Sequence, residues 1–102
     1  MEYVRLNDEV SVSRIVQGFW RLMSWYTSET ELASFIENCI NLGVTTFDTA
    51  EIYSKGECET CLGKALKKVS ASRCDIQIVS KTGISNGATK YYDTRYESII
   101  EA

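Results

Sequence analysis

Three polar side chains of this sequence have types and positions that suit acid–base chemistry: Asp48, Tyr53 and Lys81. Asp48 closes the run 44–48, which is rich in β-branched residues, Tyr53 follows five residues later, and Lys81 closes the run 75–81. A phenol with an ordinary pKa of about 10 becomes a useful acid near neutral pH when an adjacent ammonium stabilises its phenolate. With Asp48 holding Lys81, the set predicts that Tyr53 protonates a carbonyl oxygen while a hydride reaches the carbonyl carbon.

Each of these residues, taken singly, also fits an ordinary structural role. An aspartate at a strand end often caps a helix, a loop tyrosine often packs against the core, and a lysine after a strand often extends into solvent. A site is favoured because all three lie at the same end of consecutive predicted strands.

The site requires that the two runs form neighbouring parallel strands, and helical signals separate them as such a sheet demands. Ser28 and Glu31 form a capping box ahead of apolar residues at helical spacing, and Gly43 marks the end of that helix. A second amphipathic helix is predicted over 57–69. Because the run 14–19 predicts a further strand ahead of the first helix, strands and helices alternate.

This alternation predicts an α/β fold with a parallel sheet covered by crossover helices. Loops at the C-terminal ends of such strands surround one crevice, where Asp48 and Lys81 would lie about 5 Å apart on paired strands. A doubly wound sheet and a barrel both fit this pattern. The loop after the first strand reads Gly18-Phe19-Trp20-Arg21 and lacks the G-x-G-x-x-G motif, so a Rossmann fold is disfavoured.

The two ends of the chain carry weaker signals. Tyr3 to Leu6 and Val10 to Val12 predict a hairpin around the polar turn 7–9. A polar loop with Gly83, Asn86 and Gly87 follows the third strand, and Thr94 with Glu97 predicts a capping box for a last helix.

Composition limits the class of protein. The 102 residues suffice for one domain, 1–102, and 44% of them are hydrophobic, so a core is expected. Eleven basic and 14 acidic side chains give a net charge of −3 without a basic patch, which disfavours nucleic acid as a partner. The sequence contains no His, which excludes Ser-His-Asp and Cys-His pairs and His-ligated metals built by this chain alone.

The four cysteines are predicted to be free thiols in a reducing, cytoplasmic compartment, because the N-terminus lacks the apolar run of a signal peptide and no segment predicts a membrane span. Cys58 and Cys61 form a C-x-x-C pattern, the signature of a thiol redox site. Both lie on the apolar stripe of the second helix, beside glutamates that oppose thiolate formation, which favours core packing. A four-cysteine zinc site would need Cys39 and Cys74 to converge there, so no metal site is expected.

An aromatic cluster follows the first predicted strand. Trp20, Trp25 and Tyr26 could line a substrate entrance or simply pack together, and the sequence does not separate the two interpretations.

Three motifs along the chain are familiar: G-V-T-T-F-D-T-A-E-I-Y at 43–53, E-T-C-L-G-K-A-L-K, and I-V-S-K-T-G. They closely resemble the N-terminal part of the aldo-keto reductase family, and the resemblance extends from about Tyr3 to Ala102. G-F-W-R-L-M-S-W looks like a bacterial branch of that family. The resemblance implies an eight-stranded TIM-type (β/α) barrel closed by an N-terminal hairpin, and NADP(H)-dependent reduction of aldehydes or ketones.

The resemblance also implies roles for individual residues. Asp48, Tyr53 and Lys81 match three of the family's four catalytic positions, with Tyr53 as proton donor, Lys81 lowering its pKa and Asp48 pairing with the lysine. Phe19 and Trp20 match positions beside the nicotinamide of the cofactor, which Asp48 also reaches.

The resemblance is incomplete. The family's fourth catalytic residue, a His on the next strand, has no counterpart here, and neither do the later strands that hold the 2′-phosphate and adenine. We therefore expect a truncated barrel with about three βα units, whose chemistry requires the missing C-terminal part. The alternative is an inert partial barrel or interaction piece that assembles with itself or with a separate remainder. The specific carbonyl substrate and the oligomeric state stay open.

Overall fold

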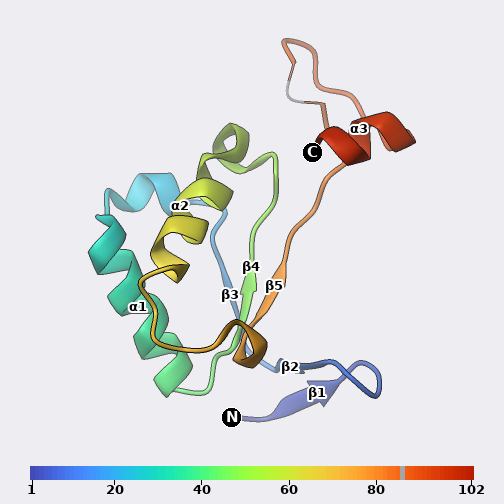
Figure 1. Ribbon diagram of the computed structural model, residues 1–102. Helices are drawn as coiled ribbons and strands as arrows, with labels where there is room; N and C mark the ends of the chain where they lie inside the picture. The colour runs from blue at the N-terminus through green and yellow to red at the C-terminus, as the bar shows by residue number, and fades with distance from the viewer. Residues whose placement is uncertain (86) are drawn as a thin grey trace.

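A three-stranded parallel sheet forms the centre of the computed structural model, which describes residues 1–85 and 87–102; Asn86, in the predicted polar loop, lies outside the described residues. The strand order is β3 (Val16–Gly18), β4 (Thr46–Asp48) and β5 (Gln77–Val79). Both pairings are parallel, as the alternation predicts, and Figure 1 shows the strands side by side. The described residues form this open sheet and no closed barrel.

Two helices cover one face of the sheet (Figure 1): α1 (Glu29–Asn41) and α2 (Glu57–Leu66). Successive residues of a strand face opposite sides, so Phe47, which is fully buried, packs toward the helices while Thr46 and Asp48 face the other side. The hydrophobic core lies between the helices and the sheet. Its buried members are Phe19, Leu22, Leu32, Ala33, Ile36, Cys39, Phe47, Cys58, Leu62, Ala65 and Ile76.

The first helix begins and ends where the sequence predicts. Ser28 Oγ accepts the N–H of Glu31 at 3.1 Å, and the Glu31 carboxylate accepts the N–H of Ser28 at 2.8 Å, which completes the capping box. These hydrogen bonds hold the pKa of Glu31 below its ordinary value. Gly43 follows the helix with φ of +86°, a left-handed conformation that favours glycine. A Cβ at this position would also lie only 2.7 Å from Met1 Cβ, so both the backbone conformation and the available space require glycine.

The second helix is shorter than the predicted span 57–69. The N–H of Lys68 donates to Ala65 O and that of Val69 to Leu66 O, which are the i to i−3 bonds of a tightened last turn. The start at Glu57 agrees with the prediction, directly after Gly56, whose φ is +89°.

The predicted N-terminal hairpin is confirmed as β1 (Tyr3–Arg5) and β2 (Ser11–Ser13), which are antiparallel. Figure 1 shows it at the ends of the parallel strands where those strands begin. Ser13 Oγ accepts the N–H groups of Thr45 and Thr46, both at 3.1 Å, and Thr46 Oγ1 accepts the N–H of Ser13 at 2.9 Å. These bonds attach the hairpin to the N-terminal end of the sheet, away from Asp48.

The predicted capping box at Thr94 is wrong. Helix α3 (Tyr96–Glu101) begins after Arg95, which makes no side-chain cap. Asp93 instead anchors the residues around the helix start, because its carboxylate accepts the N–H of Arg95 at 3.2 Å and the hydroxyl of Ser98 at 2.8 Å. Hydrogen bonds from Arg95 and Ser98 hold the pKa of Asp93 well below its usual range.

The face of the sheet opposite the helices is partly open. Val16 is 44% exposed and Val79 is 41% exposed, and Asp48 is on the same face. Within residues 1–85 and 87–102, no helix combines the length and the apolar character needed to cross a membrane.

Candidate active site

Asp48 and Lys81 form an ion pair at the C-terminal ends of β4 and β5. Lys81 Nζ lies 2.8 and 2.9 Å from the two carboxylate oxygens of Asp48, and it also donates to the carbonyl oxygen of Thr49 at 2.5 Å. The register differs from the expectation of directly opposed residues, because Asp48 pairs with Val79 across the sheet. Lys81 lies two residues further on, and its long side chain reaches back to Asp48.

Backbone hydrogen bonds continue the β4–β5 ladder beyond the two strands and thereby place Lys81. The N–H of Thr49 donates to Val79 O, and the N–H of Glu51 donates to Lys81 O, each at 2.9 Å. The spacing of two residues is that of a parallel ladder. Lys81 is therefore on the same face of the extended sheet as Asp48, and its amino group meets the carboxylate.

Tyr53 completes the predicted set. It begins the short 3₁₀ helix η2 (Tyr53–Gly56), and its N–H donates to Ala50 O at 3.1 Å. Lys81 Nζ lies 5.2 Å from the centroid of the half-buried Tyr53 ring. The structure thus brings all three residues to one rim of the sheet, which is the geometry that the sequence predicts.

The electrostatics of this rim centre on the Lys81 ammonium. Removal of water works against the charged form, but the hydrogen bonds and negative charge of Asp48, with a smaller contribution from Tyr53, outweigh it and raise the pKa of Lys81 above its ordinary value. Lys81 therefore stays protonated beside Tyr53 throughout the neutral range.

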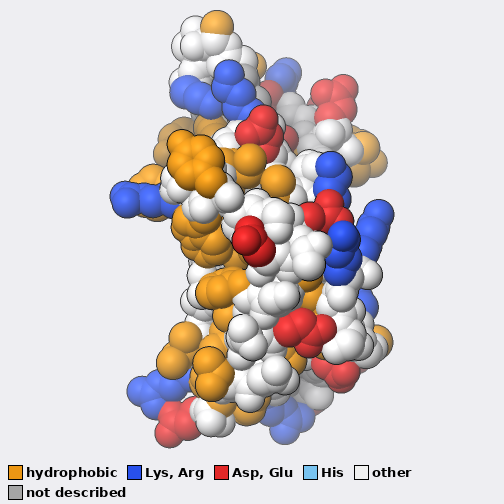
Figure 2. Space-filling model, turned by 90° about the vertical axis from the view of Figure 1, so that its left-hand side faces the viewer, with side chains coloured by type: hydrophobic (Ala, Val, Ile, Leu, Met, Phe, Trp, Pro, Cys, Tyr) orange, Lys and Arg blue, Asp and Glu red, His pale blue; other side chains and the backbone are white. Residues whose placement is uncertain are grey.

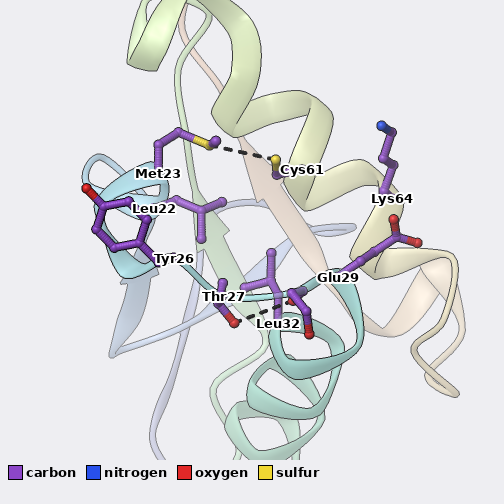
Figure 3. Close-up of a pocket in the computed structure, with 9 residues that line it drawn as sticks. Leu22, Met23, Tyr26, Thr27, Glu29, Leu32, Cys61 and Lys64 are labelled. Atoms are coloured by element: carbon purple, nitrogen blue, oxygen red, sulfur yellow. Dashed lines mark hydrogen bonds between the residues drawn. The ribbon is translucent and has the colours of Figure 1, made fainter.

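Among the cavities of the described residues, one beside the strand ends and one on the helical side bear on the candidate site. A cleft of about 220 Å³ opens beside Tyr53 and Lys81, with Ala50, Ile52 and Ile84 among its apolar walls. A larger cavity of about 280 Å³ (Figure 3) lies between the 3₁₀ helix η1 (Leu22–Trp25) and the two long helices. Its lining contains none of the predicted site residues, whereas Tyr53 and Lys81 both line the smaller cleft.

Trp20 and Phe19, both expected beside a nicotinamide, occupy different environments. The Trp20 ring is 64% exposed and its centroid lies 6.5 Å from that of Tyr53. Phe19 is fully buried and stacks on Phe47. Side chains alternate along the strand, so Phe19, which follows Gly18, faces the helices and belongs to the core. Only its backbone reaches the rim, where the N–H of Phe19 donates to Asp48 O.

The remaining aromatic residues after β3 divide between packing and exposure. The Trp25 ring contacts Phe19 and Phe35, at centroid distances of 5.9 and 5.6 Å. Tyr26 is 93% exposed and takes a left-handed backbone conformation with φ of +50°. Trp25 therefore packs, whereas Tyr26 is an open surface residue.

All four cysteines are free thiols, as predicted. Cys58 is fully buried, which confirms its packing role, and burial raises the pKa of the Cys39 thiol. Cys61 is half-buried and its sulfur lies 3.7 Å from that of Met23, the contact drawn in Figure 3. Among the described residues, no group of three Cys, Asp or Glu side chains converges on a metal position.

Sequence reasoning missed two contacts beside Lys81. The hydroxyl of Ser80 donates to the Glu59 carboxylate, and that of Thr82 donates to the Glu51 carboxylate at 2.5 Å. The partners are 21 and 31 residues apart. No local spacing pattern links residues so distant, and the contacts become visible only once α2 and the β4 loop are placed against the end of β5.

Comparison with known proteins identifies the family of the chain. The sequence model of the aldo/keto reductase family matches residues 14–102. The chain is 44% identical over 95 residues to the oxidoreductase YdhF of Escherichia coli, covering 88% of this chain and 32% of that protein. It is 43% identical over 84 residues to the uncharacterized oxidoreductase YcsN of Bacillus subtilis, covering 82% and 28%.

A third relative is the 6-dehydroglucose reductase of Agrobacterium fabrum, 38% identical over 102 residues, with 92% of this chain and 34% of that protein covered. The chain thus spans about a third of the length of the curated relatives it matches. The family match includes Asp48, Tyr53 and Lys81 within its span. The chain belongs to the aldo/keto reductase family.

Proposed function

We propose that this chain supplies the acid–base residues of an NADP(H)-dependent oxidoreductase that reduces an aldehyde or ketone to an alcohol. The observation that carries the proposal is the Lys81–Asp48 ion pair beside the Tyr53 ring. Membership of the aldo/keto reductase family supports the oxidoreductase class, and one relative is named as a reductase. The substrate is proposed to be a small carbonyl compound in the cytoplasm.

The proposed chemistry uses each of the three residues once. The Tyr53 hydroxyl donates a hydrogen bond to the substrate carbonyl oxygen and transfers its proton as hydride reaches the carbonyl carbon. The phenolate that remains is stabilised by the Lys81 ammonium. Asp48 accepts two hydrogen bonds from Lys81 and so keeps the ammonium in place. When bound, NADPH supplies the hydride.

The residues at the rim fit the nicotinamide end of such a cofactor. The exposed Trp20 ring beside Tyr53 offers a flat aromatic surface, and the Asp48 carboxylate, 29% exposed, offers acceptors for hydroxyl groups. Trp20 and Asp48 would hold this end, with Phe19 contributing its backbone. The preference for a 2′-phosphate rests on the family alone.

We further propose that the chain forms the first βα units of a (β/α)₈ barrel, as the family implies. The open face of the sheet, with Val16 and Val79 partly exposed, is where the rest of such a barrel would close. The same open face favours a second candidate function, an inert piece that assembles with itself or with a separate remainder. The two candidates differ in whether a protein containing these residues binds NADPH.

Substitution of Tyr53 by phenylalanine tests the proposed proton donor. In the protein at the length of its relatives, Tyr53→Phe should lower kcat for carbonyl reduction by about 10²–10⁴-fold and leave NADPH affinity, measured by fluorescence quenching, nearly unchanged. Tyr96→Phe, at a residue 75% exposed on α3, is the matched control and should alter neither quantity. Equal loss of activity and cofactor affinity in Tyr53→Phe would contradict the assigned role.

A further inference from the structure

Lys81 lies two residues beyond the end of β5, where one backbone hydrogen bond, from Glu51 N–H to Lys81 O, continues the ladder. Strand β5 ends at Val79, and the side chain of Lys81 is 48% exposed. A long, half-exposed lysine loses much rotamer freedom when it is fixed in one position. Its ion pair with Asp48 is also open to water, which weakens it. The ladder bond from Glu51 N–H holds the Lys81 backbone, and further contacts are needed to fix the direction of its side chain so that the amino group stays beside Tyr53.

The two neighbours of Lys81 supply that restraint. Ser80 donates its hydroxyl to Glu59 Oε1, and Thr82 donates its hydroxyl to Glu51 Oε2 at 2.5 Å. The carboxylates come from separate elements, Glu59 from the first turn of α2 and Glu51 from the loop between β4 and η2. Hydrogen bonds to ionised acceptors are shorter and roughly twice as strong as those between neutral groups.

The direction of these bonds matters for Lys81. Because side chains alternate along an extended chain, Ser80 and Thr82 face away from the side that carries Lys81. The alternation agrees with the contacts, since Ser80 meets the helix α2 and Lys81 meets Asp48 on the opposite face. These two hydrogen bonds, made by the residues before and after Lys81 on the opposite face, prevent the segment 80–82 from rotating about its own axis. The backbone hydrogen bond from Glu51 N–H to Lys81 O fixes the position of the Lys81 backbone against the loop that follows β4.

We infer that Glu59 and Glu51 are positioning residues: through the hydroxyls of Ser80 and Thr82, they orient Lys81 toward Asp48 and Tyr53. This inference rests on the proposed function for its catalytic consequence. Its structural content, the orientation of one amino group, is independent of catalysis. Glu59 and Glu51 would act without touching the substrate or the cofactor.

The test uses substitutions that change one hydroxyl at a time in the intact protein. Thr82→Val removes the hydroxyl and keeps the shape, whereas Thr82→Ser keeps the hydroxyl. Ser80→Ala and Ser80→Thr form the second matched pair. The first readout is the rate at which acetic anhydride labels the Lys81 amine, followed by mass spectrometry against the other lysines. The second is the division of any kinetic change between kcat and the KM for NADPH.

We expect Thr82→Val and Ser80→Ala to raise the labelling rate of Lys81 about three- to tenfold, because each loses one solvent-exposed hydrogen bond, whose net contribution is that of an ordinary bond. Carbonyl reduction should fall in kcat by a similar factor while the KM for NADPH stays unchanged. Thr82→Ser and Ser80→Thr should restore both quantities to within about twofold of the wild-type values. Labelling of Lys90, an exposed lysine on the loop that follows β5, should be equal in all variants.

The outcomes separate the inference from the proposed function. Unchanged Lys81 labelling in both hydroxyl-deleted variants, with native circular dichroism, would overturn the positioning role. Equal increases in the hydroxyl-keeping variants would overturn it as well, since the hydroxyl would then be irrelevant. If the wild-type protein reduces no carbonyl compound but the labelling pattern holds, the positioning role stands and the proposed function fails.

Discussion

Replacement of Asp48 by asparagine measures how strongly the ion pair holds Lys81. Asp48→Asn keeps the size of the side chain and one of the two oxygens, which lie 2.8 and 2.9 Å from Nζ, and removes the negative charge. The two side chains are 48% and 29% exposed, so water screens the pair. The expected loss in the free energy of unfolding at pH 7 is therefore about 1 kcal/mol, well below the cost of breaking a buried pair.

The pH dependence of that loss follows from the direction of the Lys81 shift. The pKa of Lys81 is higher in the folded protein than its ordinary value. Such a group stabilises the fold fully below its unfolded pKa, about 10.4 for lysine, and this contribution is lost as the pH rises through the folded pKa. The gap in stability between the wild type and Asp48→Asn should therefore be constant in the neutral range and close above about pH 10.4.

Urea unfolding followed by tryptophan fluorescence, at pH 7 and over an alkaline series, measures the gap. Both proteins carry Tyr53→Phe in this comparison, so that ionisation of the remaining tyrosines, which lie outside the Asp48–Lys81–Tyr53 set, affects both alike and cancels in the difference. Asp8→Asn is the control, because Asp8 pairs with Arg5, which does not titrate in this range. The stability gap of the control should persist at alkaline pH. If the gap of Asp48→Asn persists there as well, Lys81 is not the group through which Asp48 stabilises the fold.

Three further substitutions or reactions test the fold. Phe47→Ala removes a fully buried ring stacked on another, so it should cost about 3–5 kcal/mol in urea unfolding, and a cost below about 1 kcal/mol would place Phe47 outside the core. Ser28→Ala should cost about 1 kcal/mol by loss of the cap and Ser28→Asp almost nothing; equal costs would rule out capping. An aromatic disulfide should label exposed Cys74 in the native protein and buried Cys58 only after unfolding, and rapid native labelling of Cys58 would contradict its packing.

The parts of the fold that local signals determine could be predicted from the sequence. Helix α1 is one example, because its capping box, its apolar spacing and its terminal glycine all lie within sixteen consecutive residues, 28–43. The parallel order of β3, β4 and β5 is another, because helices between strands leave few other topologies. Tyr53, Lys81 and Asp48 could be placed at one rim for the same reason.

Features that depend on distant partners could not be predicted in this way. Thr94 and Glu97 have the spacing of a capping box, yet α3 begins after Arg95 without a side-chain cap, and it is the Asp93 carboxylate that binds Arg95 and Ser98. Phe19 occupies a sequence position expected beside the cofactor, but its side chain has the core available on the helical side and is buried there. Local spacing describes which contacts are possible, and tertiary packing selects among them.

The core and the candidate site depend on the same register. Phe47 pairs with Ile78 across the sheet, and both face the helices, so the neighbouring Asp48 and, three residues after Ile78, Lys81 must face the open side. A slip of one residue between sequence and strand would exchange the two faces. It would then expose the ring of Phe47 and bury the ammonium of Lys81, and both changes are costly. The hydrophobic residues that select the register therefore also select which polar side chains face the open side of the sheet. A shift of register that moved Lys81 away from Asp48 would disrupt the core as well.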